Sequence, residues 1–181
     1  MLFELNIKLS EKDYFEFNEF WMLRSHYGKA QMVKFRIGIA LVAFLAVLGF
    51  CIGDASLEDK LIYLIAYAVV MTVFQLLFNR FMLLSLKGQI KALKKKGKMA
   101  YTPESTMQFD DSVFIETTPT ERAERSYSSL ERVSILSGKV VYIHLNNVTA
   151  YIVPRDSFDS EEQYNAFLEF IKTKCANIDV Y

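Results

Sequence analysis

Two uncharged apolar stretches decide the fold of this chain: residues 37–53, IGIALVAFLAVLGFCIG, and residues 61–78, LIYLIAYAVVMTVFQLLF. At about 1.5 Å of rise per residue, each forms a helix roughly 26–27 Å long, close to the thickness of the hydrocarbon layer of a bilayer. Apolar side chains surround both helices, whereas a soluble helix of this length normally carries a polar stripe. The pair therefore predicts a transmembrane hairpin at 33–80, with helices at about 35–53 and 61–80.

Two alternatives compete with a transmembrane hairpin. A buried helical hairpin at the centre of a soluble protein would also be apolar, but it does not explain the basic residues that flank the pair. A cleavable signal peptide fits poorly, because the first stretch begins only at residue 37, behind a segment with its own helical pattern.

The charged residues are sorted along the chain although the formal net charge is zero. Residues 24–36 and 79–98 contain basic residues and no acidic ones, while the connection at 54–60 is net acidic. Basic residues concentrate on the cytoplasmic side of membrane proteins. We therefore expect both termini in the cytoplasm and the short connection outside. The zero net charge argues against a general nucleic-acid-binding protein.

A lysine cluster follows the second apolar stretch. Such a cluster beside a cytoplasmic membrane surface attracts anionic lipid headgroups by about 1 kcal/mol per charge. The alternatives are that the lysines only set topology, or that they face the C-terminal part of the chain, which is net acidic. The candidate lipid contacts are Lys87, Lys91, Lys94, Lys95, Lys96 and Lys98.

Small residues share one face of the first apolar helix. Gly49 and Gly53 form a GxxxG pattern, and Ala46 lies on the same face. Small residues let helix backbones approach closely in membranes. The pattern predicts helix packing within the hairpin or in a homodimer, unless the glycines only mark a helix end.

The N-terminal segment 1–30 is expected to lie in the cytoplasm. Residues 2–9 alternate between apolar and polar and predict a half-buried strand. Ser10 then begins a helix whose aromatic residues include Tyr14 and Phe17. This helix can lie on the membrane surface or pack against the cytoplasmic domain. Its acidic polar face favours the second, since anionic headgroups would repel it.

After a basic juxtamembrane helix at 81–98, stopped by Gly97, the pattern changes to period two. Residues 99–181 predict a cytoplasmic domain of about six strands followed by a helix that begins at Ser160, with Gln163 at capping-box spacing. The predicted fold class is α+β, with a transmembrane hairpin and an antiparallel β domain. The predicted strands lie at 105–110, 113–118, 121–127, 130–136, 139–145 and 149–153.

This layout resembles the YcxB-like family of bacterial membrane proteins. The stretches YSSLERV at 127–133 and YIVPRDSF at 151–158, followed by a capped helix, carry the resemblance. The resemblance implies a pleckstrin-homology-like fold for the cytoplasmic domain and residence in the bacterial plasma membrane. It implies no reaction and no catalytic residues.

No residue pattern indicates catalysis, a metal site or a cofactor. The two histidines, His26 and His144, have no partner at metal-ligand spacing, and His144 is expected at a surface or a sheet edge. There is no glycine-rich phosphate loop and no nucleophile elbow. We expect a non-enzymatic interaction or sensing module that contacts the lipid bilayer and an unidentified protein partner. The alternative is an accessory subunit of a transporter or another membrane complex.

Overall fold

The computed structural model describes residues 2–52 and 56–181 and divides into two compact units. The β-domain contains the N-terminal residues up to Asn18 together with Ile90–Tyr181, and the helical unit contains Glu19–Gln89. After a first short strand, two long helices lie in the N-terminal half of the chain, and antiparallel strands and a C-terminal helix follow. The fold class is α+β, as the sequence predicts.

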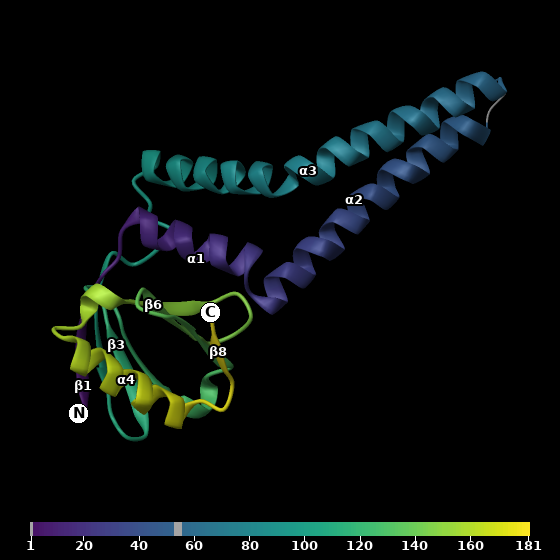
Figure 1. The fold of residues 1–181 in the computed structure, drawn as a ribbon. Coiled ribbons are helices and arrows are strands. Elements are labelled where there is room, and N and C mark those ends of the chain that lie inside the picture. Colours follow the sequence, from purple (N-terminus) through teal and green to yellow (C-terminus); the bar gives the residue numbers. More distant parts are fainter. Residues whose placement is uncertain (1, 53–55) are drawn as a thin grey trace. The chain divides into compact units, whose positions relative to one another are not determined.

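Three helices contribute to the helical unit. Helix α1 (Glu11–Leu23) ends in it, α2 (His26–Ile52) lies entirely within it, and α3 (Leu57–Lys95) begins in it. Helices α2 and α3 run side by side as a hairpin (Figure 1). Both are long and apolar enough to cross a membrane.

Aromatic contacts and side-chain hydrogen bonds hold the hairpin together, and one of these bonds runs from the Arg36 guanidinium of α2 to the Asn79 side-chain oxygen of α3. The Tyr67 hydroxyl donates to the backbone oxygen of Ala40 at 3.0 Å, and the Phe44 ring lies 5.7 Å from the Tyr67 ring. Nearer the other end, the rings of Phe35 and Phe78 are 6.0 Å apart. In an apolar solvent such contacts replace the hydrophobic effect as the source of helix association.

The helices extend beyond the apolar stretches. Helix α2 begins at His26, ahead of the predicted start, because residues 26–36 are also good helix formers without a proline or a competing cap. Helix α3 is continuous to Lys95, so the basic segment is an extension of the second apolar helix. It stops at Gly97, whose φ of +67° lies in the left-handed region that glycine adopts without strain.

A tight corner joins α1 to α2. The Ser25 hydroxyl accepts a hydrogen bond from the Gly28 N–H at 3.0 Å, which caps α2, and donates to the Trp21 backbone oxygen at 2.7 Å. Ser25 is 1% exposed. A Cβ on Gly28 would lie 1.8 Å from the Trp21 oxygen. Only glycine therefore fits at this corner.

The first sheet of the β-domain has four antiparallel strands. These are β1 (Phe3–Lys8), β2 (Glu104–Phe109), β3 (Val113–Thr117) and β4 (Arg122–Ser126), which lie in chain order across the sheet. Strand β1 comes from the opposite end of the sequence to the others and pairs with β2 over its full length. The helical unit is thus an insertion between two neighbouring strands.

The second sheet has the order β7-β6-β5-β8. Strands β5 (Arg132–Leu136), β6 (Val140–His144) and β7 (Ala150–Pro154) are antiparallel, and β8 (Ile178–Val180) pairs with β5 in parallel. Strand β8 is absent from the sequence prediction, because three residues are too few to show a period.

Helix α4 (Glu161–Lys174) follows a capping box that is close to the predicted one. The Ser160 hydroxyl accepts from the Gln163 N–H at 3.1 Å. The Gln163 side chain accepts in return from the N–H of Asp159, one residue before the predicted partner, at 2.7 Å. Two otherwise unpaired donors at the helix start are thereby satisfied.

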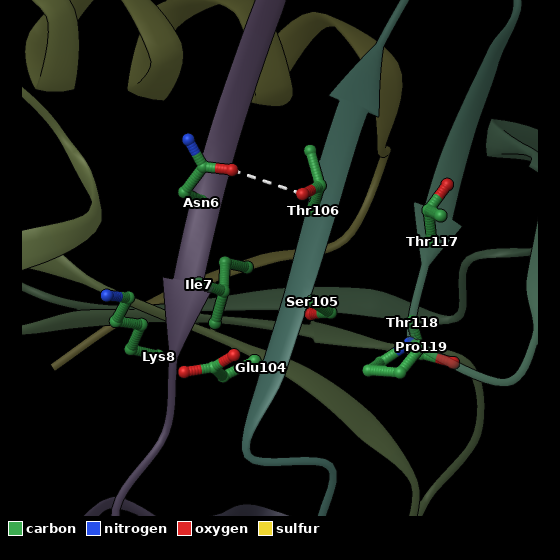
Figure 2. Close-up of a pocket in the computed structure, with 9 residues that line it drawn as sticks. All are labelled: Asn6, Ile7, Lys8, Glu104, Ser105, Thr106, Thr117, Thr118 and Pro119. Carbon is green, nitrogen blue, oxygen red and sulfur yellow. Dashed lines mark hydrogen bonds between the residues drawn. The ribbon is translucent and has the colours of Figure 1, made fainter.

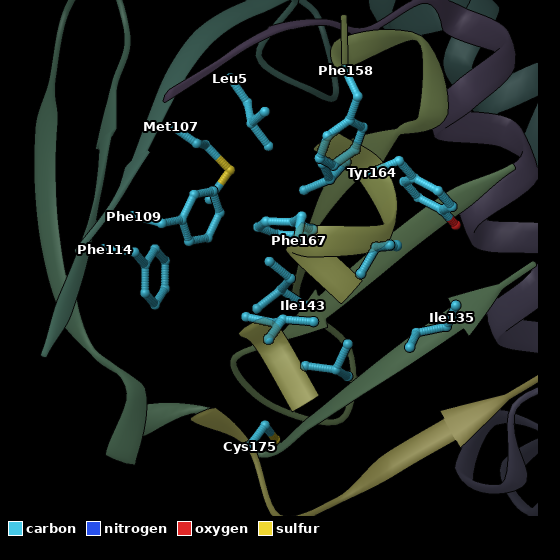
Figure 3. Close-up of a cluster of buried hydrophobic side chains, with 14 of the residues drawn as sticks. Leu5, Met107, Phe109, Phe114, Ile135, Ile143, Phe158, Tyr164, Phe167 and Cys175 are labelled. Atoms are coloured by element: carbon cyan, nitrogen blue, oxygen red, sulfur yellow. The ribbon is translucent and has the colours of Figure 1, made fainter. Parts of the chain in front are cut away.

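Phe167 of α4 is at the centre of the β-domain core (Figure 3). Its ring lies 4.9 Å from Phe109 of the first sheet and 5.2 Å from Phe158, which precedes α4. Phe158 is 6% exposed, which agrees with the anchoring role that its place after Pro154 suggests. The core is therefore built from both sheets and the C-terminal helix.

The first half of α1 packs on the β-domain. The Phe17 ring lies 5.1 Å from Tyr142 of β6, and Tyr14 stacks on Tyr101 with ring centroids 5.6 Å apart. These contacts favour domain packing over a position on the membrane surface for residues 11–18. The start of α1 is capped by Ser10 as predicted, since the Ser10 hydroxyl accepts from the Asp13 N–H at 3.4 Å. The Asp13 carboxylate accepts in return from the Ser10 N–H at 2.8 Å.

Candidate functional site

The outer surface of the helical hairpin is apolar. Val42 is 69% exposed, Leu76 is 78% exposed and Phe81 is 65% exposed. A soluble protein rarely exposes apolar side chains in a continuous band of this length. Together with the basic residues beside both helices, this apolar surface fits association of the hairpin with a membrane.

The predicted lysine cluster extends over the end of α3 and the turn after it. Lys87, Lys91, Lys94 and Lys95 lie on the helix, and Lys96 and Lys98 follow it. The Lys94 ammonium lies 3.1 Å from the Glu11 carboxylate at the start of α1. Both side chains are largely exposed, so this pair contributes little to stability. Contact between the cluster and anionic lipid stays a prediction.

The predicted small-residue face is open on the helical hairpin. A Cβ at Gly49 would meet no atom within 4 Å, so close approach of α3 does not require glycine there. Ala46 lines a shallow apolar groove of about 710 Å³ along α2 that also includes Gly38 and Val42. Gly53 lies outside the described residues. Packing against another chain stays a prediction for Ala46 and Gly49.

A serine and a histidine are in hydrogen-bond contact inside the β-domain. Ser134 Oγ of β5 and His144 Nε2 of β6 are 3.1 Å apart, a distance also seen between a nucleophile and its base. The Phe17 ring lies 6.3 Å from the His144 ring. Ser134 is 1% exposed and His144 is fully buried. No substrate can reach this pair.

The expected surface position of His144 is therefore wrong. It lies on β6, which has a neighbour on each side, and α1 packs beside it. Burial and the nearby charge of Arg132 lower the pKa of His144 to about 4. Its Nδ1 has no hydrogen-bond partner among the described residues, so no carboxylate orients the imidazole. The pair is a buried polar contact of the sheet.

A polar hollow of about 530 Å³ lies over the first sheet (Figure 2). Thr106 donates a hydrogen bond to the Asn6 side chain at 3.1 Å, and Lys8 lies opposite Glu104 in the ladder. Most of these side chains are exposed. The hollow is a solvated sheet surface and presents no unusual chemistry.

A second cavity, of about 410 Å³, lies within the β-domain under the first half of α1. Its walls include Tyr14, Phe17 and Tyr101, and its floor includes Met107 of β2 and Glu116 of β3. Glu116 is partly buried, and loss of hydration raises its pKa. This partly open cavity combines aromatic side chains with a carboxylate on the inward face of the first sheet.

Sequence reasoning missed the cavity, although one signal was present. Phe114 and Glu116 are two residues apart on a strand and so share its inward face. An acidic residue in that register breaks the apolar alternation. Tyr101 and Tyr14 carry no comparable signal, because their stacking depends on a contact between distant segments.

No group of three or more histidine, cysteine, aspartate or glutamate side chains that could hold a metal ion occurs within residues 2–52 and 56–181. Cys51 and Cys175 are free thiols on separate units.

Residues 109–171 match the family model described as YcxB-like protein. The match begins at the last residue of β2 and ends within α4, so it covers most of the β-domain but neither β1 nor the helical unit. No curated protein and no solved structure matches the chain. The C-terminal part of the chain is therefore a YcxB-like domain, as the sequence resemblance implies.

Proposed function

We propose that this protein is a membrane-anchored, non-enzymatic binding module of the bacterial plasma membrane. In this proposal α2 and α3 span the bilayer, both termini are cytoplasmic, and the β-domain binds a partner there. The insertion of the helical unit between β1 and β2 carries the proposal. Because β1 and β2 are hydrogen-bonded neighbours, two covalent connections fasten the domain to the hairpin, which restricts where the domain can go.

The fold of the β-domain supports a pleckstrin-homology-like module. A four-stranded antiparallel sheet is followed by three more antiparallel strands and a helix that packs into the core. Such domains are binding scaffolds, and their loops and sheet edges determine what they bind. The inaccessible Ser134–His144 contact supports a role without catalysis.

Topology is tested by single-cysteine labelling in intact cells, with Cys51 and Cys175 replaced. A cysteine at exposed Ser56, in the connection between α2 and α3, should react with a membrane-impermeant maleimide. A cysteine at exposed Lys139, in the β5–β6 turn, should react only after permeabilisation. The reverse pattern would reject the cytoplasmic placement.

Contact with anionic lipid is tested with spin-labelled lipids and the full chain in bilayers. We expect phosphatidylglycerol to associate more strongly than phosphatidylcholine, because each lysine near the surface adds about 1 kcal/mol. Replacing Lys91, Lys95, Lys96 and Lys98 by glutamine should remove this preference, and replacing Lys139 and Lys172 should not. An unchanged preference in the fourfold variant means that the lysines only set topology.

A second candidate function is an accessory subunit of a transporter or another membrane complex, or a homodimer within the membrane. The apolar groove along α2, with Gly38, Val42 and Ala46, favours it, since small residues admit a neighbouring helix. A photoreactive residue at Val42 should then crosslink to a single protein. Crosslinks to lipid alone would reject this second candidate, because they would show that no protein packs against α2 in the bilayer.

A further inference from the structure

The cavity under α1 is the strongest unexplained feature of the β-domain. Met107 lies directly opposite Glu116 in the β2–β3 ladder, so their side chains share the inward face of the first sheet. Met107 is fully buried and belongs to the core. Glu116 therefore places a carboxylate next to the apolar core. Packing by itself would be satisfied by an apolar side chain at this position.

No lysine or arginine lines this cavity. Arg125 of β4 is a cation that acts on Glu116, but its Nε donates at 2.9 Å to the hydroxyl of Tyr151, and the guanidinium lies outside the lining. The Ser105 side chain also stabilises the Glu116 carboxylate through a hydrogen bond. No ion pair joins Arg125 to Glu116 within the described part of the chain. Glu121, the other charged residue that acts on Glu116, is acidic. Glu116 is thus the one formally charged group facing the cavity.

The walls suit the body of an organic cation. Tyr14 and Tyr101 stack on each other at one side, and Phe17 and Tyr151 add two further rings. Aromatic faces attract ammonium groups, and a carboxylate within reach adds a charge-assisted hydrogen bond. A cavity of about 410 Å³ is within the size range of small-molecule sites.

We propose that the cavity bounded by Tyr14, Tyr101 and Glu116 binds a small organic cation, with a protonated amine on the Glu116 carboxylate and an apolar body against the rings. This site lies entirely within the β-domain and does not depend on membrane topology. Through this site the binding module senses a cationic metabolite at the membrane surface.

Calorimetric titration of the full chain in detergent micelles tests this proposal with three probes of similar shape. Phenethylamine should bind, whereas neutral 2-phenylethanol and anionic 3-phenylpropionate should bind at least about tenfold more weakly, since they cannot pair with the carboxylate. Equal affinity for all three probes, or no binding of phenethylamine, overturns the proposal.

Two matched variants assign the effect to Glu116. Glu116→Gln keeps the size of the side chain and removes a poorly hydrated charge, so the fold is retained, and phenethylamine affinity should fall at least about tenfold. Glu124→Gln makes the same change of net charge on the outward face of β4 and should bind as the natural chain does. Unaltered binding in Glu116→Gln places the amine elsewhere and rejects the site.

Discussion

Leu5 of β1 lies opposite Met107 of β2, and both side chains are fully buried, although the whole helical unit separates them in the sequence. The β-domain therefore closes only after the chain has passed through both long helices and returned. The core of the β-domain contains residues from both sides of the inserted helical unit. The N-terminal strand is thus part of the core of the β-domain, although the family match begins only at residue 109.

Leu5→Ala should destabilise the β-domain by about 2–5 kcal/mol, because it leaves a cavity in the core. Leu2→Ala, at a 50% exposed side chain just before β1, is the control and should change stability by under about 0.5 kcal/mol. Urea unfolding in detergent, followed by circular dichroism of the strands, measures both. Equal effects of the two variants would show that β1 is dispensable.

Gly28→Ala should destabilise the corner between α1 and α2 by about 1–3 kcal/mol, because the added methyl group collides with the Trp21 backbone oxygen. Gly38→Ala is the matched control, since a Cβ there meets nothing within 4 Å. It should leave stability unchanged or raise it slightly through helix propensity. The thermal unfolding midpoint of Gly28→Ala should therefore be clearly lower than that of Gly38→Ala.

Stability should fall as the pH falls from about 6.5 toward 4. The pKa of His144 is lowered from 6.5 to about 4 in the folded chain, so the unfolded chain binds more protons in this window. The loss is on the order of 3 kcal/mol and is complete below about pH 4. Denaturant titrations at pH 7, 6 and 5 measure it. His144→Gln should remove this contribution, while substitution of the exposed His26 should retain it.

Val42→Lys distinguishes a helix in the membrane from a helix exposed to water. In a bilayer, a lysine at the middle of the helix costs about 2.5–3.5 kcal/mol of insertion free energy. In water, a lysine at a position that is 69% exposed would cost almost nothing. We expect the variant to be depleted from the membrane fraction, and Lys34→Gln, near the helix start, to remain there. Full solubility of the natural chain without detergent would contradict the anchor itself.

The local chemistry of the chain was readable from the sequence. Uninterrupted apolar runs predict the two long helices, because helix length and the absence of charge are properties of consecutive residues. Ser10, Ser160 and Gly97 mark helix ends, since caps and left-handed turns involve residues only a few positions apart. The period-two pattern likewise predicts the six strands between residues 102 and 154.

Tertiary structure decided which of these pieces belong together. Pairing of β1 with β2, burial of His144 and enclosure of Glu116 all depend on contacts between segments far apart in the chain. Alternation assigns a residue to one face of a strand, but it does not say whether another element covers that face. For that reason the sequence determined the helices, strands and the charge that surrounds the membrane anchor, and only the folded chain produced the cavity and its carboxylate.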